Sequence, residues 1–373
     1  MPRMDLIDHI EETNLRYNYC RSVLRSFFLP FVTLLVAAGL SFGQERQVTK
    51  LAEGVYAIQH KSIRAGESGN TTVIIGDREV FVVDSGYFPS VAREDIAQIH
   101  QWTNKPVGYL LNTHFHNDHN NGNRTYLDAF PSLAIVAQEE TKKDMDLIQP
   151  GNIERGPKRD AEMIAAFKQG KGPDGHALSD DEKKQAQELI PVLENAAAEF
   201  KTIIYQSPTL TFTDEIDVDL GNREVQVKYL GRGNTAGDAI VYLPKEKIIV
   251  AGDLLVEPLP YPYDGYPSEW VHTLRKMAKL DASTIVPGHG PIMHDMTYLN
   301  LVADLMQSAV DQVRARIRQL GFPGGLTLDQ IKGSVDLTPF RAKFAGSDKD
   351  VEAAFDDMAA NLVKITFSEA AQR

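Results

Sequence analysis

Residues 112–120 read NTHFHNDHN and place three histidines and one aspartate within six positions: His114, His116, Asp118 and His119. Imidazole and carboxylate groups are zinc donors, and they do not depend on sulfur. Side chains two residues apart in an extended segment point the same way, so His114 and His116 can converge on one ion. Asp118 and His119 lie just past the expected strand end, where they can face a second ion. The stretch predicts a metal site, although one short loop rarely supplies every zinc ligand.

Further donors are expected where other strands end. The segments EVFVVDSG, KIIVAGD and TIVPGHG are β-branched runs that stop at a polar residue flanked by glycine: Asp84, Asp253 and His289. A single aspartate at such a place is more commonly an ordinary turn residue. Loops that follow the strands of a rigid sheet are also where functional side chains gather. Together with the HxHxDH stretch, the three residues form a plausible ligand set.

The elements that would position these residues alternate between short strands and helices. Strands are expected at 55–60, 71–77, 79–86, 107–115 and 133–138, with a helix at 89–102. Further strands are expected between 209 and 253 and at 284–290, with helices at 267–280 and about 296–319. Residues 139–205 have a helical, amphipathic character broken by PGN, GPK and QGKGPDG. Two runs of strands, each followed by helices, predict an α/β (α+β) sandwich of four layers, with two sheets between helices.

The N-terminal segment has the pattern of an export signal. Arg16, Arg21 and Arg25 precede an apolar run at 27–40, and the small residues Ser41 and Gly43 follow it. The run is short for a membrane span, although an uncleaved anchor is the alternative. We expect residues 1–43 to be a signal peptide and the mature protein to be periplasmic or secreted, without a stable membrane span.

Charge and cysteine content narrow the possible partners. The chain carries a net charge of −12, and residues 1–43 contain four Arg and four Asp or Glu, so the remainder keeps the same net charge. An acidic chain without a basic cluster repels phosphate backbones, so nucleic acid is not expected as a partner. The single cysteine, Cys20, lies in the expected signal peptide. Metal chemistry must therefore use His, Asp, Glu or Asn, and a small molecule is the expected substrate; the sequence does not specify an oligomeric state.

The motifs THFHNDH, AGD and PGHG, in this order and spacing, resemble the metallo-β-lactamase superfamily. The resemblance covers roughly residues 50–295. It implies an αββα sandwich over residues 48–300, with a helical insertion at about 139–205 and a C-terminal helical extension at 301–373. It also implies a two-metal hydrolase centre with His114 and His116 at the first metal, Asp118, His119 and His289 at the second, Asp253 bridging both, and Asp84 orienting the ligand loop.

One position departs from the family pattern. The family has a further first-site histidine in a GHT-like turn, whereas this chain reads LGRGNTAGD and has Asn234 there. A neutral amide oxygen is a poor zinc donor, so we expect a strong second site and a weakened first site, with one or two Zn²⁺ ions per chain. Asn234 either binds weakly while Asp253 supplies much of the binding, or leaves the first site empty, or is replaced by a distant histidine. The free candidates for such a replacement are His60, His272 and His294.

The expected reaction is metal-assisted hydrolysis. Zinc lowers the pKa of a bound water to about 7, and the resulting hydroxide attacks a carbonyl carbon. We expect Asp118 and Asp253 to be catalytic, with Asp118 orienting the nucleophile or moving a proton. The substrate would be an ester, thioester, lactone or amide, β-lactams included. The alternative is a non-catalytic binding protein of the same fold, because loss of a ligand is a step towards a pseudoenzyme.

An aromatic segment follows Asp253 directly. The sequence EPLPYPYDGYPSEW contains Tyr261, Tyr263 and Tyr266. These tyrosines either form an aromatic wall of the substrate pocket or belong to a proline-stiffened loop that packs on the sheet.

Overall fold

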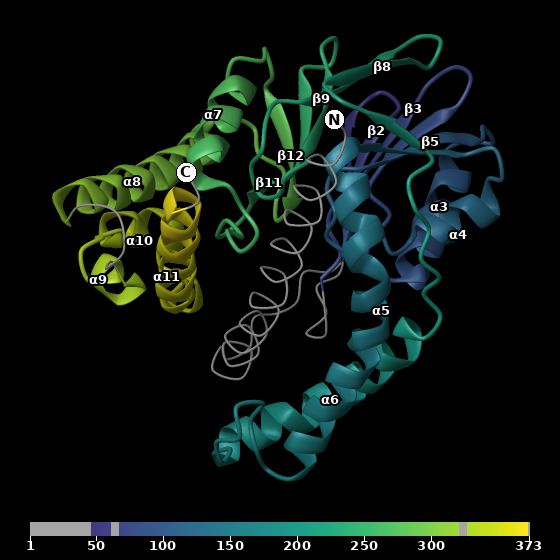
Figure 1. Cartoon of the computed structure of the whole chain (residues 1–373). Coiled ribbons are helices and arrows are strands. Elements are labelled where there is room, and N and C mark those ends of the chain that lie inside the picture. Colours follow the sequence, from purple (N-terminus) through teal and green to yellow (C-terminus); the bar gives the residue numbers. More distant parts are fainter. Residues whose placement is uncertain (1–45, 61–66, 321–326, 372–373) are drawn as a thin grey trace, which may run out of the picture.

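The computed structural model describes residues 46–60, 67–320 and 327–371. The predicted signal peptide at 1–43 lies outside the described residues. Two sheets lie face to face, and helices cover the outer side of each (Figure 1). This arrangement confirms the predicted αββα sandwich. Within the described ranges, no helix is long and apolar enough to cross a membrane.

The first sheet contains seven strands in chain order: β1 (Gln47–Ala52), β2 (Val55–Gln59), β3 (Thr71–Ile75), β4 (Val80–Val83), β5 (Val107–Asn112), β6 (Ala134–Gln138) and β7 (Leu210–Phe212). Strands β1 to β4 pair antiparallel, and β4 to β7 pair parallel. The turn signal Gly76-Asp77 lies between β3 and β4, where Ile75 pairs with Val80. Parallel pairing of β4 and β5 brings the residues that follow both strands to one edge of the sheet.

The second sheet has the strand order β12-β11-β10-β9-β8. Its strands are β8 (Glu215–Asp219), β9 (Glu224–Tyr229), β10 (Ala239–Leu243), β11 (Ile248–Val256) and β12 (Thr284–His289). Only β11 and β12 pair parallel, so their carboxyl ends also point the same way. Asp253 and His289 come from these two neighbouring strands.

The core has three layers of apolar side chains. Between the sheets, Phe81 and Leu111 of the first sheet pack with Val227, Val241 and Val250 of the second. Outside the first sheet lie α3 (Pro89–Trp102) and α4 (Asn123–Ala129), whose buried apolar faces meet β2 to β6. Outside the second sheet lie α7 (Pro267–Met277), α8 (Thr297–Leu320), α9 (Leu328–Lys332), α10 (Thr338–Ala345) and α11 (Lys349–Ala371). Burial of these alternating faces fixes the relative position of the strand ends that carry the candidate ligands.

The segment expected to be helical at 139–205 forms α5 (Glu139–Lys168) and α6 (Asp180–Phe200), which project away from the sheets (Figure 1). The breaks predicted at PGN and GPK were wrong, because α5 continues through Pro150 and Pro157. Packing overrides the local preference: a Cβ at Gly156 would lie 2.9 Å from the ring of Phe200, so the two helices approach closely there. Only QGKGPDG ends the helix.

Two further details differ from the sequence prediction. Helix α4 was not predicted from the sequence. The strand expected at 107–115 ends at Asn112, because the backbone N–H of Thr113 bonds to the Asp84 carboxylate instead of continuing the ladder. The predicted boundary at 300 falls inside α8, and the division into domains stays a prediction.

Candidate metal centre

The HxHxDH stretch follows β5, and the other candidate donors come from β4, β11 and β12. Asp84 directly follows β4 and has a left-handed backbone, with φ 61°, which aspartate tolerates better than most residues. Asp253 does not end its strand as predicted, because β11 runs on to Val256. Instead, the register of β11 against β12 shifts on both sides of Gly252, whose φ is 53°. This irregularity presents Asp253 towards the histidines from within the strand.

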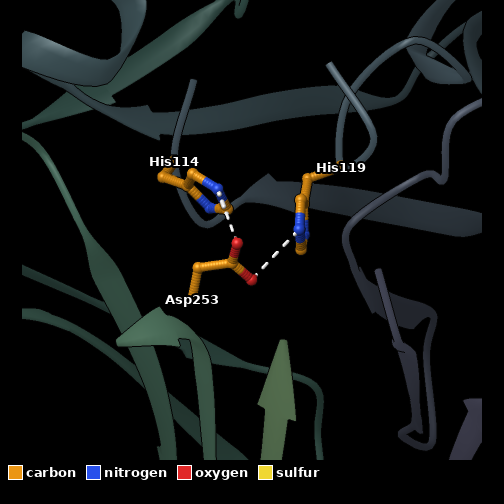
Figure 2. Close-up of side chains that lie close together, drawn as sticks. All are labelled: His114, His119 and Asp253. Atoms are coloured by element: carbon orange, nitrogen blue, oxygen red, sulfur yellow. Dashed lines mark ion pairs between the residues drawn. The ribbon is translucent and has the colours of Figure 1, made fainter. Parts of the chain in front are cut away.

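The predicted ligands lie close together, and Asp253 contacts histidines on both sides of the cluster. In a first group, Nε2 of His114 lies 2.9 Å from Nδ1 of His116 and 3.6 Å from Oδ2 of Asp253. The other carboxylate oxygen of Asp253, Oδ1, lies 3.2 Å from Nε2 of His119. Figure 2 shows Asp253 between the two imidazoles with one oxygen towards each. Asp253 therefore contacts histidines from both halves of the candidate centre.

The second group gathers around His119. Its Nε2 lies 3.2 Å from Nε2 of His289 and 3.3 Å from Oδ2 of Asp118. The same oxygen of Asp118 lies 2.9 Å from Nε2 of His289. Two sets of atoms are mutually close enough to hold a metal ion, His114 with His119 and Asp253, and Asp118 with His119 and His289. These two sets share His119 and contain five of the six residues predicted at the two metals; the sixth, His116, contacts His114.

Asp84 determines which imidazole nitrogens face this centre. Its carboxylate accepts hydrogen bonds from the Thr113 backbone N–H (2.9 Å), the Thr113 hydroxyl (2.8 Å) and Nδ1 of His119 (2.8 Å). Because the Thr113 hydroxyl donates to Asp84, its contact of 3.0 Å with Nδ1 of His114 requires this nitrogen to be the donor. In the neutral imidazoles, Nε2 of both His114 and His119 then carries a lone pair that points inward. The position predicted to orient the ligand loop does contact it from outside.

The inward-facing atoms are thus acceptors that face one another. Two imidazole lone pairs and the carboxylates of Asp118 and Asp253 converge within 4 Å, an arrangement that is repulsive unless cations lie among them. A divalent metal with nitrogen and oxygen ligands satisfies this demand. The residues present therefore fit a metal centre.

Protonation preferences reflect the same crowding. Burial, with the neighbouring charge of His119, holds the pKa of His114 well below its ordinary value. Burial would also lower the pKa of His119, but the carboxylates of Asp253, Asp118 and Asp84 outweigh it and raise this pKa well above the usual value. Burial disfavours the charged form of Asp118, yet His119 and His289 hold its pKa well below the ordinary range. Without metal, protons on the histidines supply the positive charge that the carboxylates require.

Asn234 lies in the loop between β9 and β10 and is fully buried. Both polar atoms of its side chain lack a hydrogen-bond partner among the described residues. A buried amide without partners costs about 1–3 kcal/mol. An oxygen left unsatisfied in this way is consistent with a weak metal ligand, but no measured contact joins Asn234 to His114 or His116.

The other candidate histidines are not brought to the centre. Nε2 of His60 lies 3.1 Å from the Thr71 hydroxyl and 3.3 Å from Asp95. His272 and His294 are exposed. Within the described ranges, none of the three belongs to either potential metal group.

The three tyrosines have different neighbours. The Tyr261 ring lies edge-on to His116, with centroids 6.0 Å apart, and contacts Tyr263 at 4.3 Å. Tyr266 instead lies under the guanidinium of Arg232, 4.1 Å from its ring centre. Tyr261 is therefore the tyrosine closest to the predicted ligands by these contacts.

Sequence reasoning missed three residues of the centre. The Thr113 hydroxyl donates a hydrogen bond to the Asp84 carboxylate and accepts one from Nδ1 of His114. Asp264 lies 3.0 Å from Nε2 of His116. Gly69 allows a close approach, since a Cβ there would lie 2.1 Å from the His119 ring. Asp264 sits in the tyrosine-rich segment, but no local pattern links its carboxylate to His116.

Comparison with known proteins shows which family the chain belongs to. The family model of the metallo-beta-lactamase superfamily matches residues 64–289. This is more than half of the chain, which therefore belongs to the metallo-beta-lactamase superfamily. The predicted family is confirmed.

Two relatives with different names are similar to this chain. The chain is 27% identical over 279 residues to a linear primary-alkylsulfatase of a Pseudomonas species, a match covering 71% of this chain and 49% of the relative. It is 23% identical over 297 residues to a type 2 metallo-beta-lactamase of Elizabethkingia meningoseptica, covering 76% and 96%. The chain thus spans about half the length of the alkylsulfatase it matches.

A solved structure of similar fold is the DIM-1 metallo-beta-lactamase exposed to ceftazidime. It has a TM-score of 0.50 and 18% sequence identity, covering 72% of this chain and 99% of that one. At this identity the likeness concerns the fold alone.

Proposed function

We propose that this protein is a zinc-dependent hydrolase whose centre is formed by His114, His116, Asp118, His119, Asp253 and His289. The observation that supports it best is the convergence of acceptor atoms, with the outer hydrogen bonds of Asp84 committing the inner nitrogens of His114 and His119 to lone pairs. Bound zinc would supply Lewis acidity and lower the pKa of a coordinated water.

Asp118 and Asp253 would have different roles in the reaction. Asp118 is the most accessible of the second group, with 22% of its side chain exposed, so it can accept a hydrogen bond from an attacking water. Its pKa is low because His119 and His289 outweigh the effect of burial, so it stays ionised at neutral pH. Asp253 lies deeper and would hold both halves of the centre together.

We propose a strong second site and a weaker first site, because the position of the family histidine holds a neutral amide, Asn234. The buried, unpartnered amide of Asn234 supports weak ligation. One or two zinc ions per chain are expected, depending on zinc concentration. Elemental mass spectrometry after zinc loading and gel filtration measures the number of zinc ions bound per chain and tests this proposal.

The proposed substrates are small molecules with an ester, thioester, lactone or amide bond. A β-lactam belongs to this group, and the type 2 metallo-beta-lactamase relative supports including it. The alkylsulfatase relative supports adding sulfate esters of primary alcohols. Tyr261, beside His116, would form part of the substrate-binding wall, with Tyr263 behind it and Tyr266 further along the segment.

A substrate panel with matched variants tests the proposed activity. Chromogenic esters, lactones, a cephalosporin and an alkyl sulfate would be compared for the parent, Asp118→Asn and Asp128→Asn. Asp128 is an exposed aspartate of α4 paired with Arg124, so it controls for loss of a carboxylate. We expect hydrolysis of at least one substrate by the parent and by Asp128→Asn, its loss with EDTA, and a large loss in Asp118→Asn.

The same panel distinguishes the alternative. Zinc binding without turnover of any substrate would favour the non-catalytic binding protein. Hydrolysis that resists EDTA would contradict a metal-dependent mechanism.

We further propose that the protein is exported after removal of residues 1–43. The basic flank, short apolar run and small-residue exit support this. N-terminal sequencing of the protein recovered from its native host tests it, and a retained N-terminus would contradict it.

A further inference from the structure

Asp264 contacts a predicted ligand from outside the centre. It belongs to the segment that links β11 to α7, and its Oδ2 lies 3.0 Å from Nε2 of His116. A carboxylate can only accept, so Nε2 of His116 is the donor. The other ring nitrogen, Nδ1, then carries the lone pair of the neutral imidazole and faces Nε2 of His114 at 2.9 Å.

The same type of outer contact thus recurs at three of the histidines. Thr113, itself held by Asp84, accepts from His114, and Asp84 accepts from His119. At His116 the acceptor is Asp264, which lies 148 positions further along the chain. A carboxylate hydrogen-bonded to the outer nitrogen of a metal-binding histidine fixes its tautomer and raises its basicity.

We infer that Asp264 is a positioning residue that prepares His116 to bind the first metal and partly offsets the neutral amide at Asn234. The inference rests on the proposed function, because it assigns a role within the same centre. Replacing an imidazole ligand by a neutral amide weakens a zinc site. A carboxylate that accepts a hydrogen bond from the outer nitrogen of another imidazole ligand raises the basicity of that ligand.

The chain just after Asp264 is held by contacts with two other parts of the fold. The Tyr266 backbone N–H donates to the Gly233 carbonyl at 2.8 Å, next to Asn234. Glu369 of α11 accepts hydrogen bonds from the Ser268 backbone N–H at 3.0 Å and from the Ser268 hydroxyl at 2.6 Å. The residues that follow Asp264 are therefore anchored to the Asn234 loop and to the C-terminal helix.

Zinc affinity is the first test. Competition titration with a chromophoric chelator would be done on full-length parent, Asp264→Ala, Asp264→Asn and Asp304→Asn. Asp304 is a remote, exposed carboxylate paired with Arg275, so it controls for the change in net charge. We expect the weaker zinc affinity to fall by about 10- to 100-fold in Asp264→Ala, less in Asp264→Asn, whose amide oxygen still accepts the hydrogen bond, and not in Asp304→Asn. The tighter affinity should stay unchanged.

The tautomer of His116 is the second test and needs no metal. Long-range ¹H–¹⁵N spectra of the EDTA-treated protein, at alkaline pH where the imidazoles are neutral, distinguish protonation at Nδ1 from protonation at Nε2. We expect the Nε2–H form in the parent and in Asp264→Asn, and a mixture in Asp264→Ala. A purely structural role of Asp264 would not change this ratio.

The two tests separate the possible failures. An unchanged tautomer in Asp264→Ala overturns the inference, whatever the metal content. A parent that binds no zinc and hydrolyses nothing overturns the proposed function, while the tautomer still reports whether Asp264 positions His116. Equal loss of zinc affinity in Asp304→Asn would also overturn the inference, because net charge alone would then explain the effect.

Discussion

Asp84 Oδ2 lies 2.8 Å from Nδ1 of His119, and through Thr113 the same carboxylate also holds His114. One residue at the end of β4 thereby orients histidines from both groups of the centre. Asp84 is almost completely buried, so its negative charge depends on these donors for its stability.

Substitution of Asp84 by asparagine tests this dependence. Asparagine tolerates the left-handed backbone at this position, so the fold should persist while the acceptor loses its charge. We expect zinc affinity to fall by about 10- to 100-fold with little change in the circular dichroism spectrum. Chelator competition measures the affinity, and an unchanged value would contradict the orienting role.

The Asn234→His variant tests the weakened first site. A histidine at this position would replace a neutral amide by an imidazole, the donor zinc prefers. We expect the weaker zinc affinity to improve by at least about tenfold. If titration shows no additional or tighter zinc binding than in the parent, Asn234 is not the determinant of first-site affinity.

The pH dependence of stability should reveal competition between zinc and protons. Burial acts to lower the pKa of His119 and His289, but Asp253 and Asp118 outweigh it and raise both. A histidine with a raised folded-state pKa stabilises the fold below its unfolded pKa, and this contribution is lost as pH rises through the raised value. The metal-free protein therefore loses stability towards alkaline pH, whereas bound zinc replaces the protons.

The measurement is thermal unfolding of zinc-loaded and EDTA-treated protein between about pH 6 and about pH 8.5. We expect the difference in Tm between the two forms to widen as pH rises. A difference that narrows over this range would show that the raised histidine pKa values do not govern the metal-free state.

The contact between α11 and α7 predicts a role for the C-terminal helices in stability. Tyr266 at the start of α7 makes no side-chain capping bond, and Glu369 supplies the acceptor instead. Loss of a helix cap costs about 1 kcal/mol, so Glu369→Ala should lower the free energy of unfolding by about this amount. Glu352→Ala, which removes a partly exposed carboxylate of α11 paired with Lys349, is the control in urea denaturation. Equal stability of the two variants would contradict the capping role.

Much of the fold, and the set of residues that gather at the candidate centre, could be predicted from the sequence, because both depend on local patterns. The helix at 89–102 was predicted with its observed bounds, since its apolar spacing and Pro89 are local signals. Strand ends carrying Asp84 and His289 were identified by their glycine-flanked polar residues. The helix and the strand ends are each determined by residues close to them in the sequence, so they can be predicted without knowledge of tertiary contacts.

The missed features depend on contacts between distant segments. Asp264 meets His116 across 148 positions of the chain, and no local pattern indicates this pairing. Asp253 lies inside β11 because a register shift against β12, not a turn, presents it. The continuity of α5 through two prolines depends on its packing against α6.

The most direct test is an X-ray anomalous difference map, collected at the zinc edge, from crystals of the zinc-loaded protein. We predict a strong peak among Asp118, His119, Asp253 and His289, and a weaker one beside His114, His116 and Asp253. Zinc bound elsewhere, with no peak among these six residues, would contradict the proposed metal centre.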